Sequence, residues 1–420
     1  MKSISRLILS LAVVLVTPTT TIAAPLSWGN ETLLSGSTNA WEPFIAADPN
    51  SSWVYATWFL PSGPAPCTGC ATSNIRFSSS SDGGLHWNAS TWFCPATCNS
   101  RGQYDPTIKV VPLNGTIYAM WMDWNTIMFS KSSDTGLTWA PQVQLSGNQW
   151  ADHPWFGMSA DGRDVYAFWA KGDIYGVASH DSGATWSAPK KINTDKNRQY
   201  YAEGVEVLAT GEVVVAAASY PCSKGTSQCT GAVNITTFRS TNAGVGYTAT
   251  QIEQLYTGPQ WLSNTLETIA ADSAGGLMLM YNGASTLGAN NQMYARYSSN
   301  KGLSWGPRIL LSTGPTAAAS YPAIAGHTAG RFRAVYYDNR TGAYNVWYRE
   351  TTDSGATWTP DVKISNLATG APYKTTTGFG APYGDYLGIA VLNTGQSIAV
   401  FGEAAPGQAA PGGIWMNRQQ

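Results

Sequence analysis

Seven short apolar segments of the chain each begin at a polar residue, and these first residues are the main candidates for chemistry. They are Glu42, Asp105, His153, Glu203, Glu267, Tyr321 and Asp385. Five carboxylates, an imidazole and a phenol around one opening would raise some of the carboxyl pKa values by mutual repulsion. Such a ring suits general acid/base catalysis, and it could also hold a structural cation such as calcium. The structural alternative is that each side chain accepts backbone hydrogen bonds from a neighbouring segment.

Further candidates lie in the segments around these seven positions. Arg101, Arg198 and Arg340 could bind an anionic sugar, because guanidinium groups pair with carboxylates in a bidentate manner. The alternative for each arginine is a local ion pair, such as Arg340 with Asp338. Asp123 is a further polar candidate. Aromatic side chains that could stack on sugar rings are also dense here, and we expect about half of them to be exposed: Trp41, Trp58, Trp124, Trp150, Trp155, Tyr220, Tyr337 and Tyr386.

A repeated motif, Ser-x-Asp-x-Gly-x-Thr-Trp, indicates the elements that must position these residues. Clear copies occupy residues 80–87, 132–139, 179–186 and 351–358, and weaker copies occupy 240–247 and 298–305. In each copy the Asp can accept backbone N–H groups within a turn, the Gly can adopt a positive φ, and the Trp can pack between sheets. Regularly spaced repeats of this kind predict an all-β chain of similar hairpins.

The motif resembles the Asp-box, or BNR repeat, of the sialidase superfamily, and its copies extend over nearly the whole chain after residue 24. The resemblance implies a β-propeller of four-stranded blades. It also implies that the boxes lie on the face opposite the active site, which excludes Asp82, Asp134, Asp181 and Asp353 from the site.

The seven inner-strand starts favour seven blades, with six as the alternative. The last unit has no box, but residues 26–44 align without a gap on residues 137–155, so that Trp28 matches Trp139 and Pro43 matches Pro154. The N-terminal segment is therefore predicted to supply an outer strand to the last blade and close the ring. A single domain over residues 25–420 follows.

The N-terminus has the pattern of a signal peptide over residues 1–24, with Lys2 and Arg6 before an apolar run and small residues at its end. We therefore expect a secreted, extracellular glycoprotein with sequons at Asn30, Asn50, Asn88, Asn114, Asn234 and Asn339. Six cysteines in an exported chain predict disulfides. Cys222 and Cys229 are expected to pair, whereas Cys67, Cys70, Cys94 and Cys98 allow three pairings, with a zinc site as the competing interpretation.

The charge balance excludes some partners. The net charge is −1 and only 12% of residues are charged, so nucleic acid is not an expected partner. No later apolar run approaches the ~20 residues of a membrane span, so no membrane insertion is expected. We expect a monomer that needs no cofactor and binds a glycan or oligosaccharide.

The resemblance implies a sialidase-like exo-glycosidase. Sialidases use three arginines, a tyrosine nucleophile activated by a glutamate, and an aspartate acid. Tyr321 matches the nucleophile in its late position, Glu203 or Glu267 its partner, and Asp105 or Asp123 the acid. The chain departs from the pattern at the first arginine, where it has Glu42-Pro43-Phe44-Ile45. We therefore predict hydrolysis by two carboxylates at the mouth of the central channel.

Three alternatives remain open at the level of sequence. His153 with Tyr321 or Tyr386 could perform β-elimination on a uronic acid, as a polysaccharide lyase does. A lectin would bind sugars without turnover, and an interaction scaffold would have no small-molecule site. The loops differ from blade to blade, with insertions at residues 61–71 and 220–231. One central site is therefore favoured over seven equivalent ones.

Overall fold

The computed structural model describes most of the chain after the expected signal peptide. The predictions for residues 1–24, for Asp385, and for Cys94, Cys98, Cys222 and Cys229 lie outside the described residues. The described ranges are 27–36, 39–65, 67–93, 101–148, 150–195, 197–221, 232–256, 267–314, 317–366, 386–404 and 412–420.

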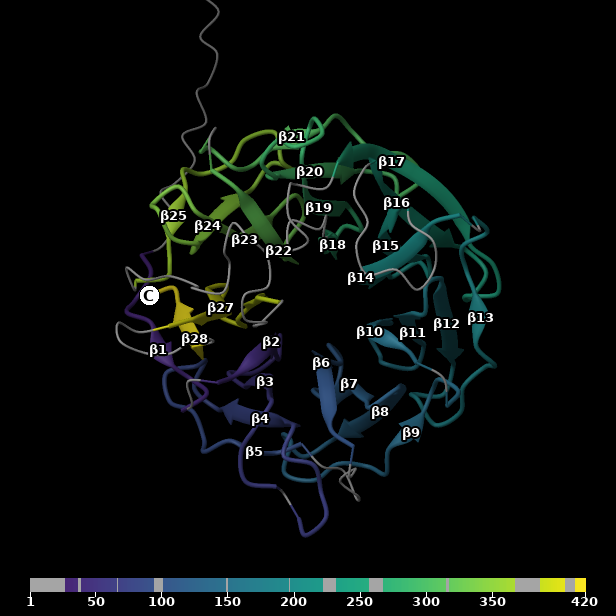
Figure 1. The fold of residues 1–420 in the computed structure, drawn as a ribbon, viewed down its shortest axis with the longest axis vertical. Helices are drawn as coiled ribbons and strands as arrows, with labels where there is room; N and C mark the ends of the chain where they lie inside the picture. Colours follow the sequence, from purple (N-terminus) through teal and green to yellow (C-terminus); the bar gives the residue numbers. More distant parts are fainter. Residues whose placement is uncertain are drawn as a thin grey trace, which may run out of the picture.

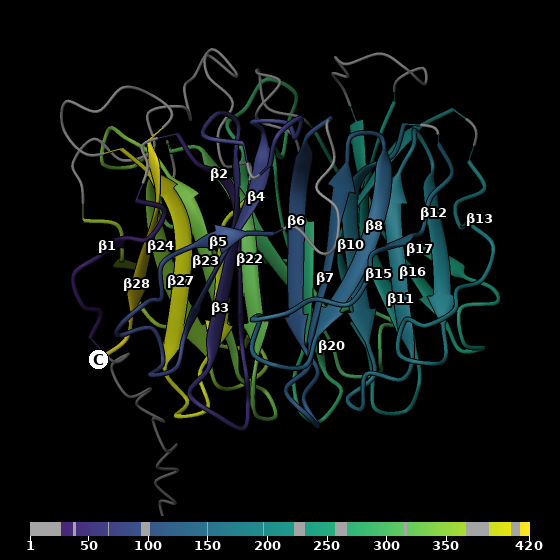
Figure 2. The same ribbon diagram turned by 90° about the horizontal axis from the view of Figure 1, so that it is seen from below.

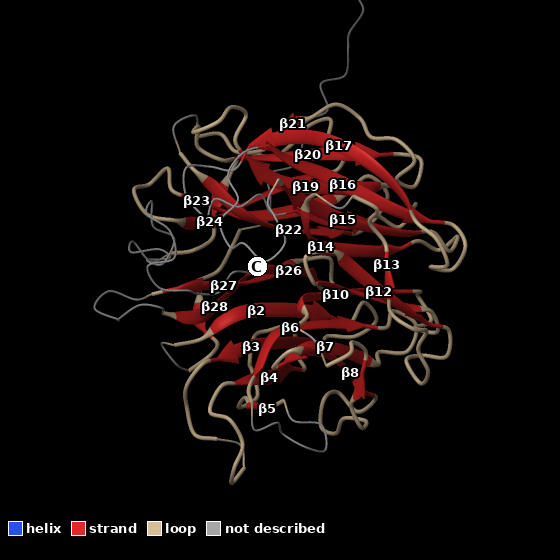
Figure 3. Cartoon of the chain, turned by 45° about the vertical axis from the view of Figure 1, so that its right-hand side comes forward, coloured by secondary structure: helices blue, strands red, loops and turns tan. Residues whose placement is uncertain are grey.

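Every regular element in these ranges is a β-strand, and the strands form seven antiparallel four-stranded blades around a central axis (Figures 1 and 3). From the inner to the outer strand, blade one consists of β2 (Trp41–Ala47), β3 (Val54–Leu60), β4 (Asn74–Ser80) and β5 (Thr91–Trp92), and blade two of β6 (Gln103–Val110), β7 (Ile117–Asp123), β8 (Thr126–Ser132) and β9 (Val143–Gln144). Blade three consists of β10 (Asp152–Met158), β11 (Val165–Ala170), β12 (Ile174–Ser179) and β13 (Lys190–Lys191), and blade four of β14 (Gln199–Val207), β15 (Val213–Tyr220), β16 (Ala232–Ser240) and β17 (Thr248–Tyr256). Blade five consists of β18 (Glu267–Ala271), β19 (Leu277–Gly283), β20 (Gln292–Ser298) and β21 (Ile309–Leu310), and blade six of β22 (Ala319–Gly326), β23 (Phe332–Asp338), β24 (Asn345–Thr351) and β25 (Val362–Lys363). Blade seven consists of β26 (Gly388–Val391), β27 (Ser397–Glu403), β28 (Gly413–Arg418) and β1 (Thr32–Leu33). The prediction of seven blades is confirmed.

The ring is closed by the N-terminal strand, as the sequence predicted. β1 pairs with β28, with Thr32 opposite Met416 and Leu33 opposite Trp415, and the purple and yellow ends of the chain lie side by side in Figure 1. The Trp28 ring packs edge-on against Tyr348 of blade six at 5.0 Å. Blade seven thus combines strands from both ends of the chain, which leaves the outer edge of β28 paired.

The repeated motif forms the predicted tight turn between the third and fourth strands. In blade two, Ser132 Oγ and the Thr138 N–H both donate to Asp134 Oδ1, at 2.8 and 2.9 Å. Gly136 has a φ of +89°, and a Cβ there would meet the Phe77 ring. The motif is therefore structural. Because successive strands of a blade are antiparallel, the motif turn lies at the end of the blade opposite the start of the inner strand.

This order defines two faces, which the side view in Figure 2 separates. The upper face carries the starts of the inner strands and the ends of the second strands, and the lower face carries the motif turns. The apolar core lies in the layers between successive blades, where Val214 and Ala216 of β15, for example, share a cluster with Leu277 and Leu279 of β19. Each layer fixes the position of one inner strand relative to the next.

Candidate active site

A β-bulge lies at the start of the inner strand in four blades, at an X-Pro pair. The pairing register shifts at Glu42-Pro43, Asp105-Pro106, His153-Pro154 and Tyr321-Pro322. The residue before each proline has a φ between 50° and 53°. Such a backbone is strained for residues other than glycine, and bulges of this kind redirect side chains at functional sites.

The register corrects the sequence alignment of the seven first residues. Glu42, Asp105, His153, Tyr321 and Tyr386 lie at the same distance before the residue whose N–H closes the inner hairpin. Glu203 and Glu267 lie one residue later in their blades. The described polar residues therefore do not form one equivalent ring, and Glu203 itself lies in a bulge between Ala202 and Gly204.

A central cavity of about 320 Å³ opens between the inner strands. Phe44, Trp155, Tyr321 and Tyr386 contribute aromatic surface to its wall, and Glu203 and Glu267 contribute carboxyl groups. Further along the channel, Lys109 donates to the carbonyl oxygen of Val205 at 3.1 Å and lies 3.9 Å from Glu206. The cavity thus combines aromatic faces with a few polar groups, which is typical of a ligand site.

The most reactive arrangement is a contact between His153 and two residues of the cavity wall. His153 Nδ1 lies 2.9 Å from Tyr386 Oη and 3.5 Å from Glu203 Oε1. The side chain of His153 is 22% exposed, whereas that of Glu203 is 7% exposed. An imidazole, a phenol and a carboxylate from blades three, seven and four therefore meet beside the cavity.

The surroundings of His153 favour its charged form. Burial alone would lower the pKa of His153, but Asp152, the hydrogen bond to Glu203 and the charge of Asp105 outweigh burial and hold the pKa well above 6.5. The protonated imidazole is therefore the favoured form. It provides a fixed positive charge in a site otherwise rich in carboxylates.

Glu203 and Glu267 form a second group, in adjacent blades. Burial and the nearby Glu203 carboxylate raise the pKa of Glu267 well above its ordinary range, although the N–H groups of Ala218 and Glu203 donate to it. Burial, together with the same two glutamates, raises the pKa of Tyr220. The Oε1 atom of Glu267 is buried without a hydrogen-bond partner. These surroundings favour the neutral, protonated form of Glu267.

No protein family matches this chain, and no curated protein matches its sequence. Solved structures match its fold. A polysaccharide lyase described as the PL25 ulvan lyase, bound to -[GlcA(1-4)Rha3S]-, aligns with a TM-score of 0.52 and 13% identity over 94% of both chains. A protein of unknown function from Dyadobacter fermentans DSM 18053 aligns with a TM-score of 0.51 and 12% identity over 94% of this chain and 98% of its own. The NanB sialidase from Streptococcus pneumoniae aligns with a TM-score of 0.50 and 10% identity over 96% of this chain and 71% of its own.

The chain has a sialidase-like β-propeller fold. At these identities the likeness concerns the fold, so the roles of individual residues rest on the geometry of this propeller.

Several predicted site residues of the propeller have structural contacts. Glu42 Oε2 accepts the Asp105 N–H at 2.8 Å and so links blades one and two. Tyr321 lines the cavity and packs edge-on against Tyr337 of its own blade at 6.4 Å. Asp123 is buried at the end of β7. The contact of Glu42 favours the structural alternative for that residue. The negative charge of Asp105 contributes to the site by raising the pKa of His153.

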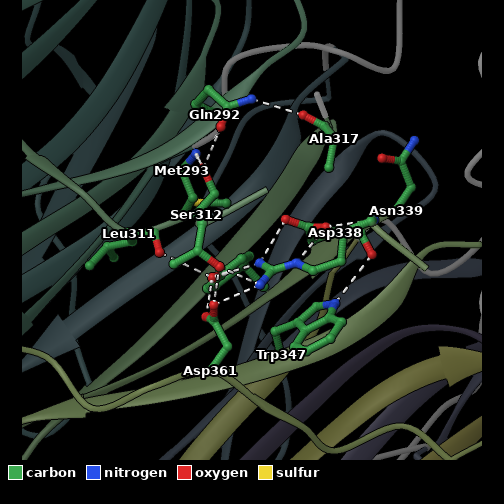
Figure 4. A network of polar contacts seen from close by, with 12 residues as sticks. Gln292, Met293, Leu311, Ser312, Ala317, Asp338, Asn339, Trp347 and Asp361 are labelled. Atoms are coloured by element: carbon green, nitrogen blue, oxygen red, sulfur yellow. Dashed lines mark hydrogen bonds and ion pairs between the residues drawn. The ribbon is translucent and has the colours of Figure 1, made fainter. Parts of the chain in front are cut away.

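Two of the three arginines are held by the propeller itself. Arg340 contacts Asp338 at 2.9 Å and Asp361 at 2.6 Å and stacks on Trp347. Figure 4 shows Asp338, Asp361 and Trp347 within this network of polar contacts. Arg198 donates to Ser219 Oγ at 2.9 Å and to the Ala232 carbonyl at 2.7 Å. Arg101 is exposed in the loop before β6. Of the three, Arg101 is the one with an exposed side chain, whereas Arg198 and Arg340 are half-buried.

The aromatic residues divide by burial. Trp58, Tyr220 and Tyr337 are core residues, whereas Trp124 and Trp150 are 44% and 46% exposed. Trp124 follows β7 with a φ of 55°, in the turn on the upper face. Trp41, Trp155 and Tyr386 are half-buried. Stacking surfaces are thus present both in the cavity wall and on the face above it.

Sequence reasoning missed Tyr201 and Asp152. The Tyr201 ring packs edge-on against His153 at 5.2 Å, and Asp152 Oδ1 accepts the His153 N–H at 3.1 Å. Tyr201 is two residues from Glu203, and a period of two within a strand was the signal that could have found it. Asp152 is adjacent to His153 in sequence.

The remaining predictions concern metals, membranes and disulfides. In the described ranges no three His, Cys, Asp or Glu residues are grouped to hold a metal ion, and no helix is long and apolar enough to cross a bilayer. Cys67 and Cys70 form a disulfide, which excludes the two pairings that join either of them to Cys94 or Cys98. Four of the six sequon asparagines, Asn30, Asn50, Asn88 and Asn114, are exposed.

Proposed function

We propose that this protein is a secreted carbohydrate-active enzyme that cleaves a uronic acid-containing polysaccharide by β-elimination. The observation that supports it is the 2.9 Å contact between His153 Nδ1 and Tyr386 Oη at the cavity wall. β-Elimination needs a base beside the carbon that bears the sugar carboxylate, a proton donor for the leaving oxygen, and a positive charge near the carboxylate. His153 and Tyr386 can supply all three.

The raised pKa of His153 supports a division of roles. In the reactive form of the pair the imidazole is protonated and Tyr386 Oη is a phenolate, which is the base that removes the C5 proton of the uronate. The electron pair of the C–H bond forms a C4–C5 double bond as the C4–O4 bond breaks, and Tyr386 returns the proton to O4. The His153 cation, paired with Glu203, stabilises the negative charge that develops on the carboxylate.

The surroundings of the cavity fit a chain-like ligand. Trp124 and Trp150 present exposed faces on the same side of the propeller, where neighbouring sugar rings could stack. Arg101 adds an exposed positive charge. Among the solved structures with this fold, the ulvan lyase is described with bound GlcA, which is a uronic acid.

The test is an assay of uronate polysaccharides with detection of the unsaturated uronate by its ultraviolet absorbance. We expect Tyr386→Phe and His153→Ala each to lower kcat at least ~100-fold, because the first removes the group that transfers the proton and the second removes the cation that stabilises the developing charge. Tyr201→Phe is the matched control, because it keeps the ring against His153 and is expected to retain activity. Full activity of Tyr386→Phe would overturn the proposal. Glycan binding without any turnover would replace it with the lectin.

Glycoside hydrolysis by Glu203 and Glu267 is the second candidate, and the raised pKa of Glu267 beside Glu203 favours it. Such enzymes use a pair of carboxyl groups, and the one that acts as the acid has a raised pKa, as Glu267 has. In that case neutral aryl glycosides would yield new reducing ends without unsaturated product, and Glu267→Gln would abolish turnover. Under β-elimination, Glu267→Gln should retain activity because the carboxyl is not a member of the reacting pair.

A further inference from the structure

A second cavity lies between blades three and four, and none of its lining residues belongs to the proposed active site. Its origin is visible in how the motif tryptophans pack elsewhere. Trp139 of blade two packs on Phe77 of blade one at 5.4 Å, and Trp186 of blade three packs on Phe129 of blade two at 5.1 Å. Each of these two junctions is thus filled by a tryptophan from one blade and an aromatic ring from the third strand of the preceding blade.

The junction between blades three and four has smaller residues at both positions. Tyr247 stands in place of the motif tryptophan, and Gly176 stands where blades one and two have Phe77 and Phe129. The Phe168 ring, opposite Gly176, occupies part of the vacated space and contacts Tyr247 edge-on at 5.8 Å. A cavity of about 240 Å³ remains.

The cavity has an apolar floor and a polar rim. We call its buried apolar lining, Gly176, Val177 and Ile192, the floor, and its more exposed polar lining, His180, Ser187, Lys190 and Tyr247, the rim. Lys190 Nζ donates to the carbonyl oxygen of Val245 at 2.5 Å, which connects the two blades at the rim. His180 Nδ1 lies 2.6 Å from Asp164, which orients the imidazole.

We infer that this inter-blade cavity, lined by Tyr247, His180 and Lys190, binds one sugar ring of a glycan. A pyranose combines an apolar face with a hydroxyl-bearing edge, and the floor and rim of the cavity match these two parts. The volume is below the ~300 Å³ at which drug-sized ligand pockets begin. The choice of a sugar rests on the proposed carbohydrate-active function, but the site is separate from His153 and Tyr386 and would hold the polysaccharide outside the central cavity.

Methyl NMR tests this site by itself. In the full protein, the Ile192 and Val245 methyl groups report the inter-blade cavity and Ile389 reports the central one. Titration with methyl glucuronide and methyl glucoside should shift Ile192 and Val245 saturably. In Tyr247→Trp, which restores the motif residue and fills the cavity, the affinity at these methyls should fall at least tenfold while the Tm is maintained or raised. Unshifted Ile192 and Val245 methyls, or equal shifts in a folded Tyr247→Trp protein, would overturn the inference.

The two proposals fail separately. His153→Ala should abolish turnover and leave the Ile192 shifts unchanged, whereas Tyr247→Trp should leave turnover of a short oligosaccharide unchanged. Absence of turnover on any substrate, with shifts at Ile192 intact, rejects β-elimination only. Turnover without shifts at Ile192 rejects the inter-blade site only.

Discussion

Residues with a left-handed backbone mark both faces of the propeller, for different reasons. On the lower face, the residue before the motif glycine has a positive φ in five blades, as Thr135 and Ser354 do with φ of 62° and 60°. Blade one has Gly83 at this place. On the upper face the same backbone occurs before proline, at His153 and three equivalent positions. On the lower face the positive φ recurs because the same turn recurs in each motif copy. On the upper face it directs a different side chain towards the centre in each blade.

Replacement of a strained turn residue by glycine should stabilise the propeller. Thr135 is β-branched at a φ of 62°, a conformation that costs such residues about 1–2 kcal/mol. Because glycine loses more backbone entropy on folding, we expect Thr135→Gly to raise the free energy of unfolding by only about 0.5–1 kcal/mol. Guanidinium chloride unfolding measures this change. The reverse substitution in blade one, Gly83→Thr, should destabilise, and stabilisation by both would contradict the explanation.

Glu267 should make the stability of the protein depend on pH. Its raised pKa means that the folded state binds the proton more tightly than the unfolded state, so stability falls as the pH rises above 4.5 towards the folded pKa. Each unit of this pKa difference corresponds to about 1.4 kcal/mol. Glu267→Gln keeps an oxygen acceptor for the N–H groups of Ala218 and Glu203 and removes the titration. The Tm of the variant should exceed that of the wild type at pH 8 by more than at pH 5, and parallel Tm profiles would contradict the assignment.

At the scale of the element, the motif turn depends on its charged aspartate. Hydrogen bonds from the Thr138 hydroxyl and N–H lower the pKa of Asp134 to about 2, from an ordinary 3.8. The stabilisation is therefore fully present above about pH 4 and is lost as the pH falls towards 2. We expect Asp134→Ala to lower the Tm at pH 7, with the difference from wild type disappearing near pH 2. Calorimetry at both pH values tests this, and a constant difference would show that the charge is not involved.

The elements also show where the sequence was informative. Six copies of one turn motif and seven similar strand starts were enough to predict the blades, because each blade solves the same packing problem with the same residue types. The exact alignment of Glu203 and Glu267 with the other starts was wrong, since each lies one residue nearer to its inner hairpin, an offset that the apolar pattern does not reveal. The contact of His153 with Tyr386 joins residues 233 positions apart, and the sequence offered Tyr321 equally. The engagement of Arg340 by Asp338 had been recognised as the alternative, but the contribution of Asp361 depends on the packing of blade six.

At the scale of the whole molecule, stability depends on the junction between the two ends of the chain. β1 covers the edge of β28, Trp28 packs on Tyr348, and Glu31 accepts the Asn366 N–H at 2.7 Å. A mature chain that begins at Ser35 would lose these contacts and expose β28 as a free edge. We expect its Tm to fall by ~5 °C or more and its self-association to increase with concentration.

A synthetic peptide of residues 25–36 separates loss of the strand from general damage to the fold. If the β1 to β28 pairing is the cause, the peptide should bind the shortened protein and raise its Tm with increasing peptide concentration, because a ligand of the folded state stabilises it by mass action. The same peptide with Trp28→Ala should be a weaker ligand, since it lacks the ring that packs on Tyr348. Light scattering should show that the intact peptide also suppresses association. An unchanged Tm after truncation would mean that the ring is stable without β1. In that case the N-terminal segment serves to block the β28 edge rather than to stabilise the propeller.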